Sequence, residues 1–335
     1  MTSQVDIAVI GAGVLGLATA AEMTARGHTV TVIDPGGANA SSVAAGMIAP
    51  AMEAALEGAS PERAALFRNA RDLWPAFAER SGIVLTRTGG VWLGADAAAV
   101  AERLTALGFT ATLDGDQVVT PDDWQVAAEA ALGRLRASVD VVTANAKSVR
   151  ADAHGCTIET STGAIRATSL VLATGAAAPL PGAPSDVAAR IAQIAPVRGQ
   201  IGRAFGAPLA QATRTTGGYL APAEGGALIG ATMETGRTDL APDPAAAEHL
   251  LALADRLGWA PQGPVEWRVG VRGATADGLP MAGFAAPRLW LALAPRRNGW
   301  LLAPLVARVV ADAIEGRTPV ADAAALDPLR FTPAG

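Results

Sequence analysis

DIAVIGAGVLGLATAAEMTARGHTVTVID, residues 6–34, places a glycine-rich turn between two short apolar segments that are predicted to be strands. The three glycines of its G-x-G-x-x-G pattern each have a physical task. Gly11 permits a tight turn, Gly13 lets a pyrophosphate approach the backbone, and Gly16 lets the following helix pack closely on the strand. Because both strands and the helix accompany the glycines, the stretch predicts a dinucleotide-binding strand–helix–strand unit.

The same unit predicts where a dinucleotide would be held. The N–H groups at the start of the helix, around Val14 and Leu15, attract phosphates. Asp34 ends the second strand, 23 residues after Gly11, where it can accept hydrogen bonds from an adenosine ribose. The alternative is a glycine turn that binds nothing.

Composition narrows the remaining classes of protein. With 335 residues, half of them apolar and 17% charged, the chain suits two interleaved domains with large cores. The net charge of −5 argues against nucleic acid or an acidic membrane surface as a partner. Cys156 is the only cysteine and the three histidines are far apart, so no metal site is predicted. With no apolar run long enough to span a membrane, we expect a cytoplasmic protein.

Further elements are predicted along the chain. Residues 60–80, 96–107, 120–136, 244–257 and 301–315 favour helices; residues 83–93, 141–149, 156–160, 164–166, 170–173, 196–203, 218–221, 227–232, 266–271 and 289–293 favour strands. The helix over 120–136 is predicted from Thr120-Pro121-Asp122-Asp123, which has the composition of a helix start. Nucleotide-type segments lie at both ends and around residues 140–190, which predicts a discontinuous cofactor domain.

Five motifs in a fixed order carry a resemblance to a known family. They are the glycine turn, ASSVAAGMIAP at 40–50, PVRGQ at 196–200, YLAP at 219–222 leading into IGATME at 229–234, and GVR at 270–272 through DGLP at 277–280 to RNGWLLAP at 297–304. Together they resemble the D-amino-acid oxidase family of FAD enzymes, and within it the glycine oxidases of thiamine biosynthesis. The resemblance covers most of the chain outside residues 80–140.

The resemblance implies an α/β fold with an α+β second domain. A Rossmann-like FAD-binding domain would comprise residues 1–80, 138–192 and 270–335. An interleaved substrate domain with an antiparallel sheet would comprise residues 81–137 and 193–269. Family relatives are commonly oligomeric, so a homo-oligomer is possible.

The resemblance also implies the residues that hold FAD, without a covalent bond because the only cysteine lies far from the position that relatives use. The cofactor-binding residues would be Gly11, Gly13, Val14, Leu15, Gly16, Asp34, Ser41, Ser42, Ala45, Gly46, Met47, Val149, Thr174, Gly175, Arg272, Arg297, Asn298, Gly299, Trp300 and Leu301. The residues at 297–301 precede or open a helix whose positive end would face the part of the flavin that gains charge on reduction.

For the substrate, the resemblance points to Arg272, Tyr219 and Arg297 as the catalytic set. An arginine pairs bidentately with a carboxylate, and Tyr219 falls where the family hydrogen-bonds that same group. The implied reaction is oxidative deamination of a small amino acid or amine. A hydride passes to flavin N5, the imine is hydrolysed, and O2 reoxidises the flavin to give H2O2. Glu53 could contact the substrate amine, but it is left out of this set because a solvated carboxylate at a helix start is the favoured interpretation.

The chain departs from the family beside the substrate. Ala294-Pro295-Arg296 stands where glycine oxidases usually carry Gly-His-Tyr or Gly-His-Phe, and Pro295 has no N–H to donate. Two alternatives therefore stay open: an amine dehydrogenase of the same fold that uses another electron acceptor, and a flavin-binding protein without amine oxidase activity.

Overall fold

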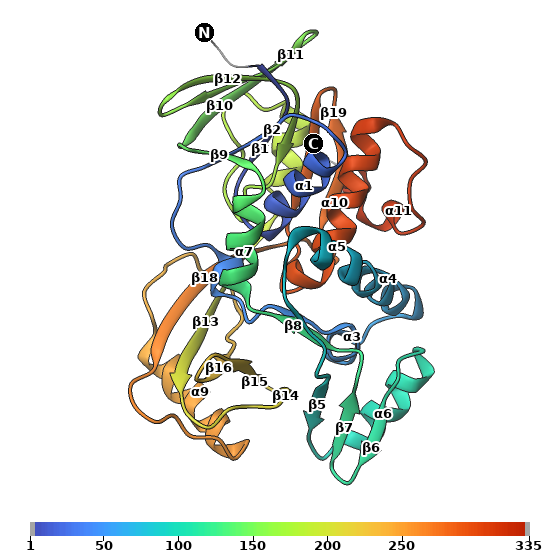
Figure 1. The fold of residues 1–335 in the computed structure, drawn as a ribbon, viewed down its shortest axis with the longest axis vertical. Helices are drawn as coiled ribbons and strands as arrows, with labels where there is room; N and C mark the ends of the chain where they lie inside the picture. Colours follow the sequence, from blue (N-terminus) through green and yellow to red (C-terminus); the bar gives the residue numbers. More distant parts are fainter. Residues whose placement is uncertain (1–3, 332–335) are drawn as a thin grey trace. The chain divides into compact units, whose positions relative to one another are not determined.

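A computed structural model describes residues 4–331 and divides them into two compact units (Figure 1). The first unit takes in the described residues of 1–39, 132–197 and 272–335, and the second takes in 40–131 and 198–271. The chain thus builds the first unit from three separate segments. Residues 40–80, predicted to belong to the FAD-binding domain, group with the second unit. That they contribute to FAD binding stays a prediction.

The first unit is organised around an eight-stranded sheet. Its strand order is β10-β11-β12-β1-β2-β9, with β20 beside β12 and β19 beside β20. The strands are β1 (Gln4–Ile10), β2 (Val30–Asp34), β9 (Asp140–Thr143), β10 (Ala146–Asp152), β11 (Gly155–Thr160), β12 (Gly163–Leu172), β19 (Met281–Ala286) and β20 (Leu289–Leu293). Strand β1 runs parallel to both β2 and β12, and β20 runs parallel to β12. This is the parallel arrangement that the glycine turn predicts.

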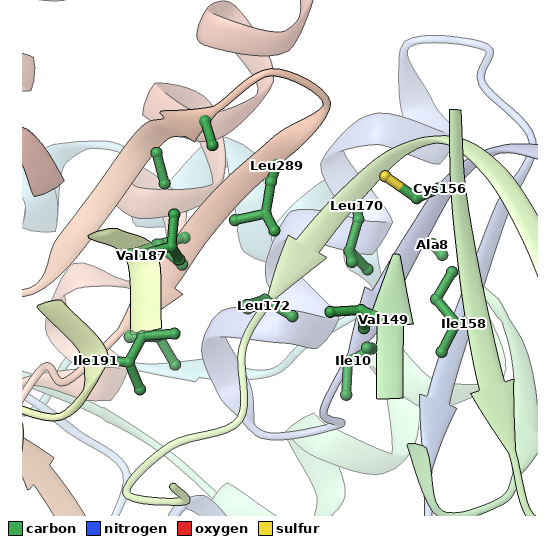
Figure 2. Close-up of a cluster of buried hydrophobic side chains, with 14 of the residues drawn as sticks. Ala8, Ile10, Val149, Cys156, Ile158, Leu170, Leu172, Val187, Ile191 and Leu289 are labelled. Carbon is green, nitrogen blue, oxygen red and sulfur yellow. The ribbon is translucent and has the colours of Figure 1, made fainter. Parts of the chain in front are cut away.

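Helices of the first unit complete its core. They are α1 (Val14–Ala25), α8 (Ser185–Ile191), α10 (Gly299–Glu315) and α11 (Ala323–Leu326), with the short 3-10 helix η1 (Pro328–Arg330). Helices α1 and α10 pack against each other. Apolar side chains from β1, β10, β11, β12, β20 and α8 form one buried cluster, shown in Figure 2 with Ile10, Val149, Leu172 and Val187 labelled. Cys156 is buried in the same cluster.

The second unit contains a nine-stranded sheet in the order β17-β13-β16-β15-β14-β5-β7-β6, with β18 beside β13. Its strands are β5 (Gly90–Leu93), β6 (Thr112–Asp114), β7 (Gln117–Thr120), β13 (Ala195–Phe205), β14 (Ala212–Thr215), β15 (Gly218–Ala223), β16 (Gly226–Gly230), β17 (Glu234–Thr235) and β18 (Glu266–Ala274). Strands β13 to β16 pair antiparallel, as predicted for the second domain.

A small sheet and several helices surround that large sheet within the second unit. The small sheet has the order β3 (Met47–Ile48), β8 (Trp124–Val126), β4 (Leu85–Thr86). The helices are α2 (Ala40–Val43), α3 (Pro50–Glu57), α4 (Pro61–Asp72), α5 (Trp74–Ser81), α6 (Ala97–Ala106) and α9 (Pro244–Arg256), and α7 (Ala128–Ala137) begins here and ends in the first unit. The α/β fold class predicted from the sequence is confirmed.

Two predicted helices differ from the structure. The helix over residues 60–80 is divided into α4 and α5, because Pro75 cannot donate the backbone hydrogen bond that would join them. The predicted start at Ser60 is confirmed, since its hydroxyl accepts from the Arg63 N–H at 3.3 Å. The helix predicted over 120–136 is wrong at its beginning: residues 120–126 form the end of β7, a turn and β8, and only 128–137 are helical.

Candidate functional site

The glycine turn of the first unit has no room for side chains. Gly11 follows β1 with φ of 111°, a conformation that disfavours any residue with a β-carbon. A β-carbon there would lie 2.3 Å from the carbonyl oxygen of Ala173, and one on Gly16 would lie 2.0 Å from the carbonyl oxygen of Gly11. The tight turn and the close helix–strand packing expected of these two glycines are therefore present.

Asp34 lies at the end of β2 and braces this turn. Its Oδ2 accepts from the Ala12 N–H at 2.7 Å, and its Oδ1 accepts from the Gly36 N–H at 2.8 Å. The carboxylate is thus held beside the glycine turn, which is the position that the sequence predicts for it. Its contact with a ribose stays a prediction.

The starts of two helices come together in the first unit. Helix α1 begins at Val14 after Gly13, and α10 begins at Gly299 after the buried Asn298. A β-carbon on Gly299 would lie 3.4 Å from Cγ1 of Val14, so the two helix starts are neighbours. Each helix N-terminus carries a partial positive charge, and two of them together favour an anionic group. Trp300 and Leu301, predicted to contact the cofactor, are buried in the first turn of α10.

Other residues predicted for the cofactor lie on neighbouring segments of the first unit. Thr174 and Gly175 follow β12, and the preceding Ala173 donates its N–H to the Ile10 carbonyl at 2.9 Å, which places them next to the glycine turn. Val149 is different. Its side chain is in the buried apolar cluster, and its N–H donates to the Pro181 carbonyl at 2.9 Å.

Arg272 and Arg297 are also on adjoining segments. Arg272 lies on β18, whose last residue, Ala274, forms a bridge with Pro295. The Arg296 N–H donates to the Gly273 carbonyl at 2.9 Å, which fixes the loop before α10 against that strand. Within this loop, the part that departs from the family pattern is unusual in conformation: Ala294 and Arg296 have φ of 59° and 53°.

The segment 40–50 forms its own part of the candidate site, in the second unit. Ser41 and Ser42 lie in α2, and Met47 pairs with Gln125 across β3 and β8. Gly46 has φ of 73°, and a β-carbon there would lie 2.0 Å from the Val126 carbonyl oxygen. The Val126 N–H donates to the Gly46 carbonyl at 2.9 Å. The glycine is required because β8 passes directly against the loop.

Gln125 on β8 contacts this segment, and the sequence reasoning missed it. Its buried amide Nε2 donates to the Ala45 carbonyl at 2.9 Å and to the Pro222 carbonyl at 3.0 Å. It thereby ties the loop at 45–47 to strand β15. The signal was hidden because residues 120–136 were predicted to be one helix, where Gln125 would have been an ordinary surface residue.

Tyr219 lies on β15 between two neighbouring strands of the large sheet. It is opposite Gly230 on β16 and opposite Arg214 on β14. A β-carbon on Gly230 would lie 2.5 Å from the tyrosine hydroxyl oxygen, so the ring covers that glycine. On the other side, the Arg214 guanidinium carbon lies 5.4 Å from the ring centroid.

Arg214 and Glu53 form a buried ion pair that the sequence reasoning also missed. Nη2 of Arg214 lies 2.7 Å from Oε1 of Glu53, and each residue is 5% exposed. The same nitrogen contacts Sδ of Met47 at 3.4 Å. The favoured interpretation of Glu53 from the sequence, a solvated helix-start carboxylate, is therefore wrong: Glu53 lies in the first turn of α3 but is buried.

Asp123 anchors helix α3 from a distant part of the second unit. Its carboxylate accepts from the N–H groups of Ala51 and Met52 at 2.9 and 3.1 Å and from the Thr120 hydroxyl at 2.8 Å. Burial raises the pKa of Asp123 to about 6, while these hydrogen bonds and the charge of Arg214 oppose that rise. The sequence predicts that residues 120–123 open a helix of their own; the Asp123 carboxylate instead caps α3.

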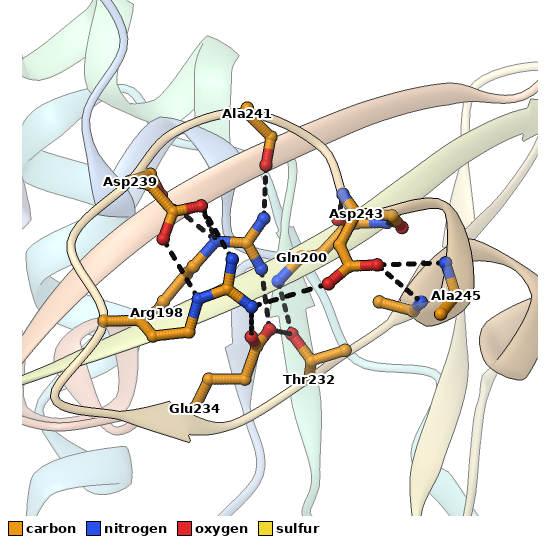
Figure 3. A network of polar contacts seen from close by, with 10 residues as sticks. Arg198, Gln200, Thr232, Glu234, Asp239, Ala241, Asp243 and Ala245 are labelled. Carbon is orange, nitrogen blue, oxygen red and sulfur yellow. Dashed lines mark hydrogen bonds and ion pairs between the residues drawn. The ribbon is translucent and has the colours of Figure 1, made fainter.

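The PVRGQ motif has a structural role in the second unit (Figure 3). Arg198 is fully buried, and its Nη1 lies 2.6 Å from a Glu234 carboxylate oxygen. It also donates to the backbone carbonyls of Asp239 and Ala241. Gln200 donates to the Asp243 carbonyl at 3.0 Å. The motif therefore holds the segment from β17 to the start of α9.

A pocket of about 190 Å³ lies within the second unit beside the segment 40–50. Ser42 and Ala45 line it together with Gln125, and Glu129, Arg203 and Arg268 contribute charged side chains. Glu129 pairs with both arginines, and Glu224 also lines the pocket, so two negative and two positive side chains compensate one another there. Among the described residues, no group of three His, Cys, Asp or Glu side chains could hold a metal ion. No helix within residues 4–331 is both long and apolar enough to cross a membrane.

Known proteins resemble this chain over nearly its full length. Residues 6–313 match the family described as FAD dependent oxidoreductase (DAO). Glycine oxidase from Geobacillus kaustophilus is 30% identical, with 97% of this chain and 96% of that protein covered. The crystal structure of glycine oxidase from that organism matches with a TM-score of 0.84 at 28% identity, covering 98% of this chain and 100% of that one. A bifunctional tRNA 5-methylaminomethyl-2-thiouridine biosynthesis protein, MnmC, from Caulobacter vibrioides is 32% identical over 90% of this chain and 53% of its own length.

Proposed function

The chain belongs to the FAD-dependent oxidoreductase (DAO) family, and on this premise we propose that it catalyses the oxidative deamination of a small amino acid or amine. The observation that carries the proposal is the similarity to glycine oxidase across nearly the whole of both chains. FAD, when bound, supplies the two-electron acceptor of the reaction. O2 is the proposed final acceptor, so H2O2 would accompany the product.

The described residues fit this cofactor. In the first unit, the glycine turn leaves bare backbone beside the neighbouring starts of α1 and α10, where phosphates are favoured. In the second unit, the close packing of Gly46 against β8 holds the backbone of the loop at 45–47 in place. We propose that these segments hold FAD, with Asp34 toward its ribose.

The chain's own residues bind and orient the substrate. We propose that Arg272 and Tyr219 each engage its carboxylate, and that Arg297 assists, on the strength of the family resemblance. The neutral amine then loses its α-hydride and one N–H proton to become an imine, which water hydrolyses to a keto acid and ammonia. Orientation and electrostatics supply this catalysis, so no nucleophilic side chain is required.

Anaerobic bleaching of the flavin by glycine, sarcosine and D-alanine tests this function. We expect at least one of them to bleach the flavin, with release of the keto acid. Arg272→Met should raise KM at least tenfold because the carboxylate loses its charged partner, which corresponds to roughly 1.4 kcal/mol. Arg308→Met is the control, since half of the Arg308 side chain is exposed, its guanidinium lies 3.8 Å from Asp312, and its loss should leave KM unchanged. Failure of all three amines to bleach the flavin would contradict the substrate class.

A dehydrogenase that uses another acceptor is the second candidate. The loop Ala294-Pro295-Arg296 favours testing it, because this sequence stands where the family usually carries Gly-His-Tyr or Gly-His-Phe, and Ala294 and Arg296 have positive φ. Dye reduction without peroxide release in air would support this candidate. Stoichiometric peroxide would exclude it.

A further inference from the structure

We propose that Arg214, held in place by Glu53, is a positioning residue that fixes the ring of Tyr219 and strengthens its hydroxyl as a hydrogen-bond donor to the substrate carboxylate. This inference rests on the proposed function, in which Tyr219 engages that carboxylate. It concerns residues of the second unit only and adds a role for an ion pair that the reaction itself does not use.

The first step of the argument is the register of the strands. Arg214 and Tyr219 are directly opposite each other in the antiparallel pair β14 and β15, so their side chains lie on the same face of the sheet. Gly230 is opposite Tyr219 on the other side and has no side chain. The ring is therefore confined between a bare glycine and a guanidinium, which leaves it little choice of position.

The second step is the charge over the ring. The guanidinium carbon of Arg214 lies 5.4 Å from the centroid of Tyr219, within the range of a cation–π interaction. A positive charge at the ring face draws electron density from the phenol and makes its O–H a stronger donor to an anion. Burial at 5% exposure strengthens this effect because water does not screen the charge.

The third step is the way in which Arg214 is held. Glu53 on α3 contacts Nη2 at 2.7 Å, and Met47 contacts the same nitrogen at 3.4 Å. Nε of Arg214 is buried and finds no hydrogen-bond partner within residues 4–331. Burying a cation that has an unused hydrogen-bond donor lowers the stability of the fold, so stability does not explain the presence of Arg214. The arrangement is explained if the charge serves the neighbouring tyrosine.

A double-mutant cycle on the FAD-loaded protein tests the proposal. Glycolate is the probe, because it has a carboxylate and no amine, and its dissociation constant is read from the change in flavin absorbance. Arg214→Met combined with Glu53→Gln removes both charges and keeps the net charge constant. We expect this change to weaken glycolate binding about tenfold with Tyr219 present and less than twofold in the Tyr219→Phe background.

Equal losses in the two backgrounds would overturn the proposal, because a merely structural ion pair would act independently of the tyrosine hydroxyl. Arg63→Met with Glu57→Gln is the matched control: its glutamate also lies on α3, its arginine lies on α4 with the paired atoms 3.3 Å apart, and it should not change glycolate affinity. If the first pair variant does not fold, Arg214→Lys takes its place. It keeps the charge but not the planar group, so a smaller loss confined to the Tyr219 background supports the proposal, and a loss of the same size in both backgrounds rejects it.

The cycle also separates this inference from the proposed function. A wild-type protein that binds no glycolate and is bleached by no amine overturns both. A wild-type protein that is bleached by an amine and binds glycolate, but whose ion-pair and tyrosine effects simply add, overturns only the role of Arg214.

Discussion

Gly11 and Gly27 share an unusual backbone conformation but differ in their surroundings. Both have positive φ, 111° and 94°. A β-carbon on Gly11 would lie 2.3 Å from the Ala173 carbonyl oxygen, whereas nothing lies within 4 Å of one on Gly27. Substitution at Gly27 therefore tests backbone strain alone, whereas substitution at Gly11 also tests the close packing against Ala173.

We expect Gly11→Ala to weaken FAD binding at least tenfold, because the new β-carbon forces the glycine turn to move away from the Ala173 carbonyl. Gly27→Ala carries the backbone strain alone, roughly 1 kcal/mol, and should keep its FAD. The measurement is the absorbance ratio of flavin to protein after dialysis. Equal retention of FAD by the two variants would contradict the close approach at Gly11.

Asp123 shows how far a single residue can be interpreted from the sequence. The stretch Thr120-Pro121-Asp122-Asp123 predicts the start of a helix, and that prediction is wrong. The Asp123 carboxylate instead accepts from Ala51 and Met52, more than 70 residues away in the chain. No local pattern reveals this partner, because it depends on how the segments pack. Arg214 was missed for the same reason.

The raised pKa of Asp123 predicts a pH dependence of stability. Between the ordinary value of 3.8 and about 6, the unfolded chain loses this proton while the folded protein keeps it, so the free energy of unfolding falls as pH rises. The fall amounts to at most ~3 kcal/mol. Asp123→Asn cannot titrate. We therefore expect the difference in urea stability between wild type and this variant to favour the wild type more strongly at pH 4.5 than at pH 7. A difference that stays constant with pH would show that Asp123 is ionised throughout.

At the scale of elements, long segments with a clear period were predicted well and short ones were not. Helices α9 and α10 and the strands around the glycine turn follow from periodicity, capping and the position of Gly316, which ends α10 with φ of 64°. Strands β3 and β17 have two residues each, too few for a periodic signal. The pairing of the loop at Met47 with β8 through β3 was therefore missed. Strand β4 is equally short but lies within residues 83–93, where strands were predicted.

The segment from β17 to α9 depends on one buried cation. Arg198 is fully buried, whereas Arg237 contacts the same Glu234 and Asp239 carboxylates with 43% of its side chain exposed. Arg198→Met should cost ~2–4 kcal/mol because the half-buried Glu234 carboxylate and the Asp239 and Ala241 carbonyls lose their buried donor. Arg237→Met should cost less than ~1 kcal/mol.

Limited proteolysis between residues 234 and 243 checks this difference, together with the free energy of unfolding in urea. We expect rapid cleavage in the Arg198 variant and cleavage at the wild-type rate in the Arg237 variant. Similar losses in the two would mean that the charge of the cluster matters more than its burial.

At the scale of the molecule, the first unit must join segments that are far apart in the chain. Strand β1 comes from the first segment, β12 from the second and β20 from the third, and they lie side by side in one sheet. The discontinuous organisation was predicted because nucleotide-type motifs occur in all three segments. The residues that hold the segments together were not predicted. They form ion pairs between charged side chains that look like ordinary surface residues in the sequence.

Arg26 is the clearest clamp between the first and last segments. At the end of α1, it contacts Asp312 and Glu315 of α10 at 2.7 Å each and Glu22 at 2.9 Å, with 12% of its side chain exposed. Arg26→Met leaves these three carboxylates facing one another without their cation, which should cost ~3 kcal/mol. Because the segments share one sheet, we expect the loss to spread to every strand that joins them.

Hydrogen exchange of the backbone amides measures that spread. The Arg26 variant should exchange faster in β1, β12 and β20, on all three segments, while β15 and β16 of the second unit keep the wild-type rates. Arg308→Met is the control, because Arg308 is 3.8 Å from the same Asp312 with half of its side chain exposed and should change exchange little. If faster exchange is confined to the ends of α1 and α10, the first unit does not unfold as one body, and the three segments are held together by the sheet alone.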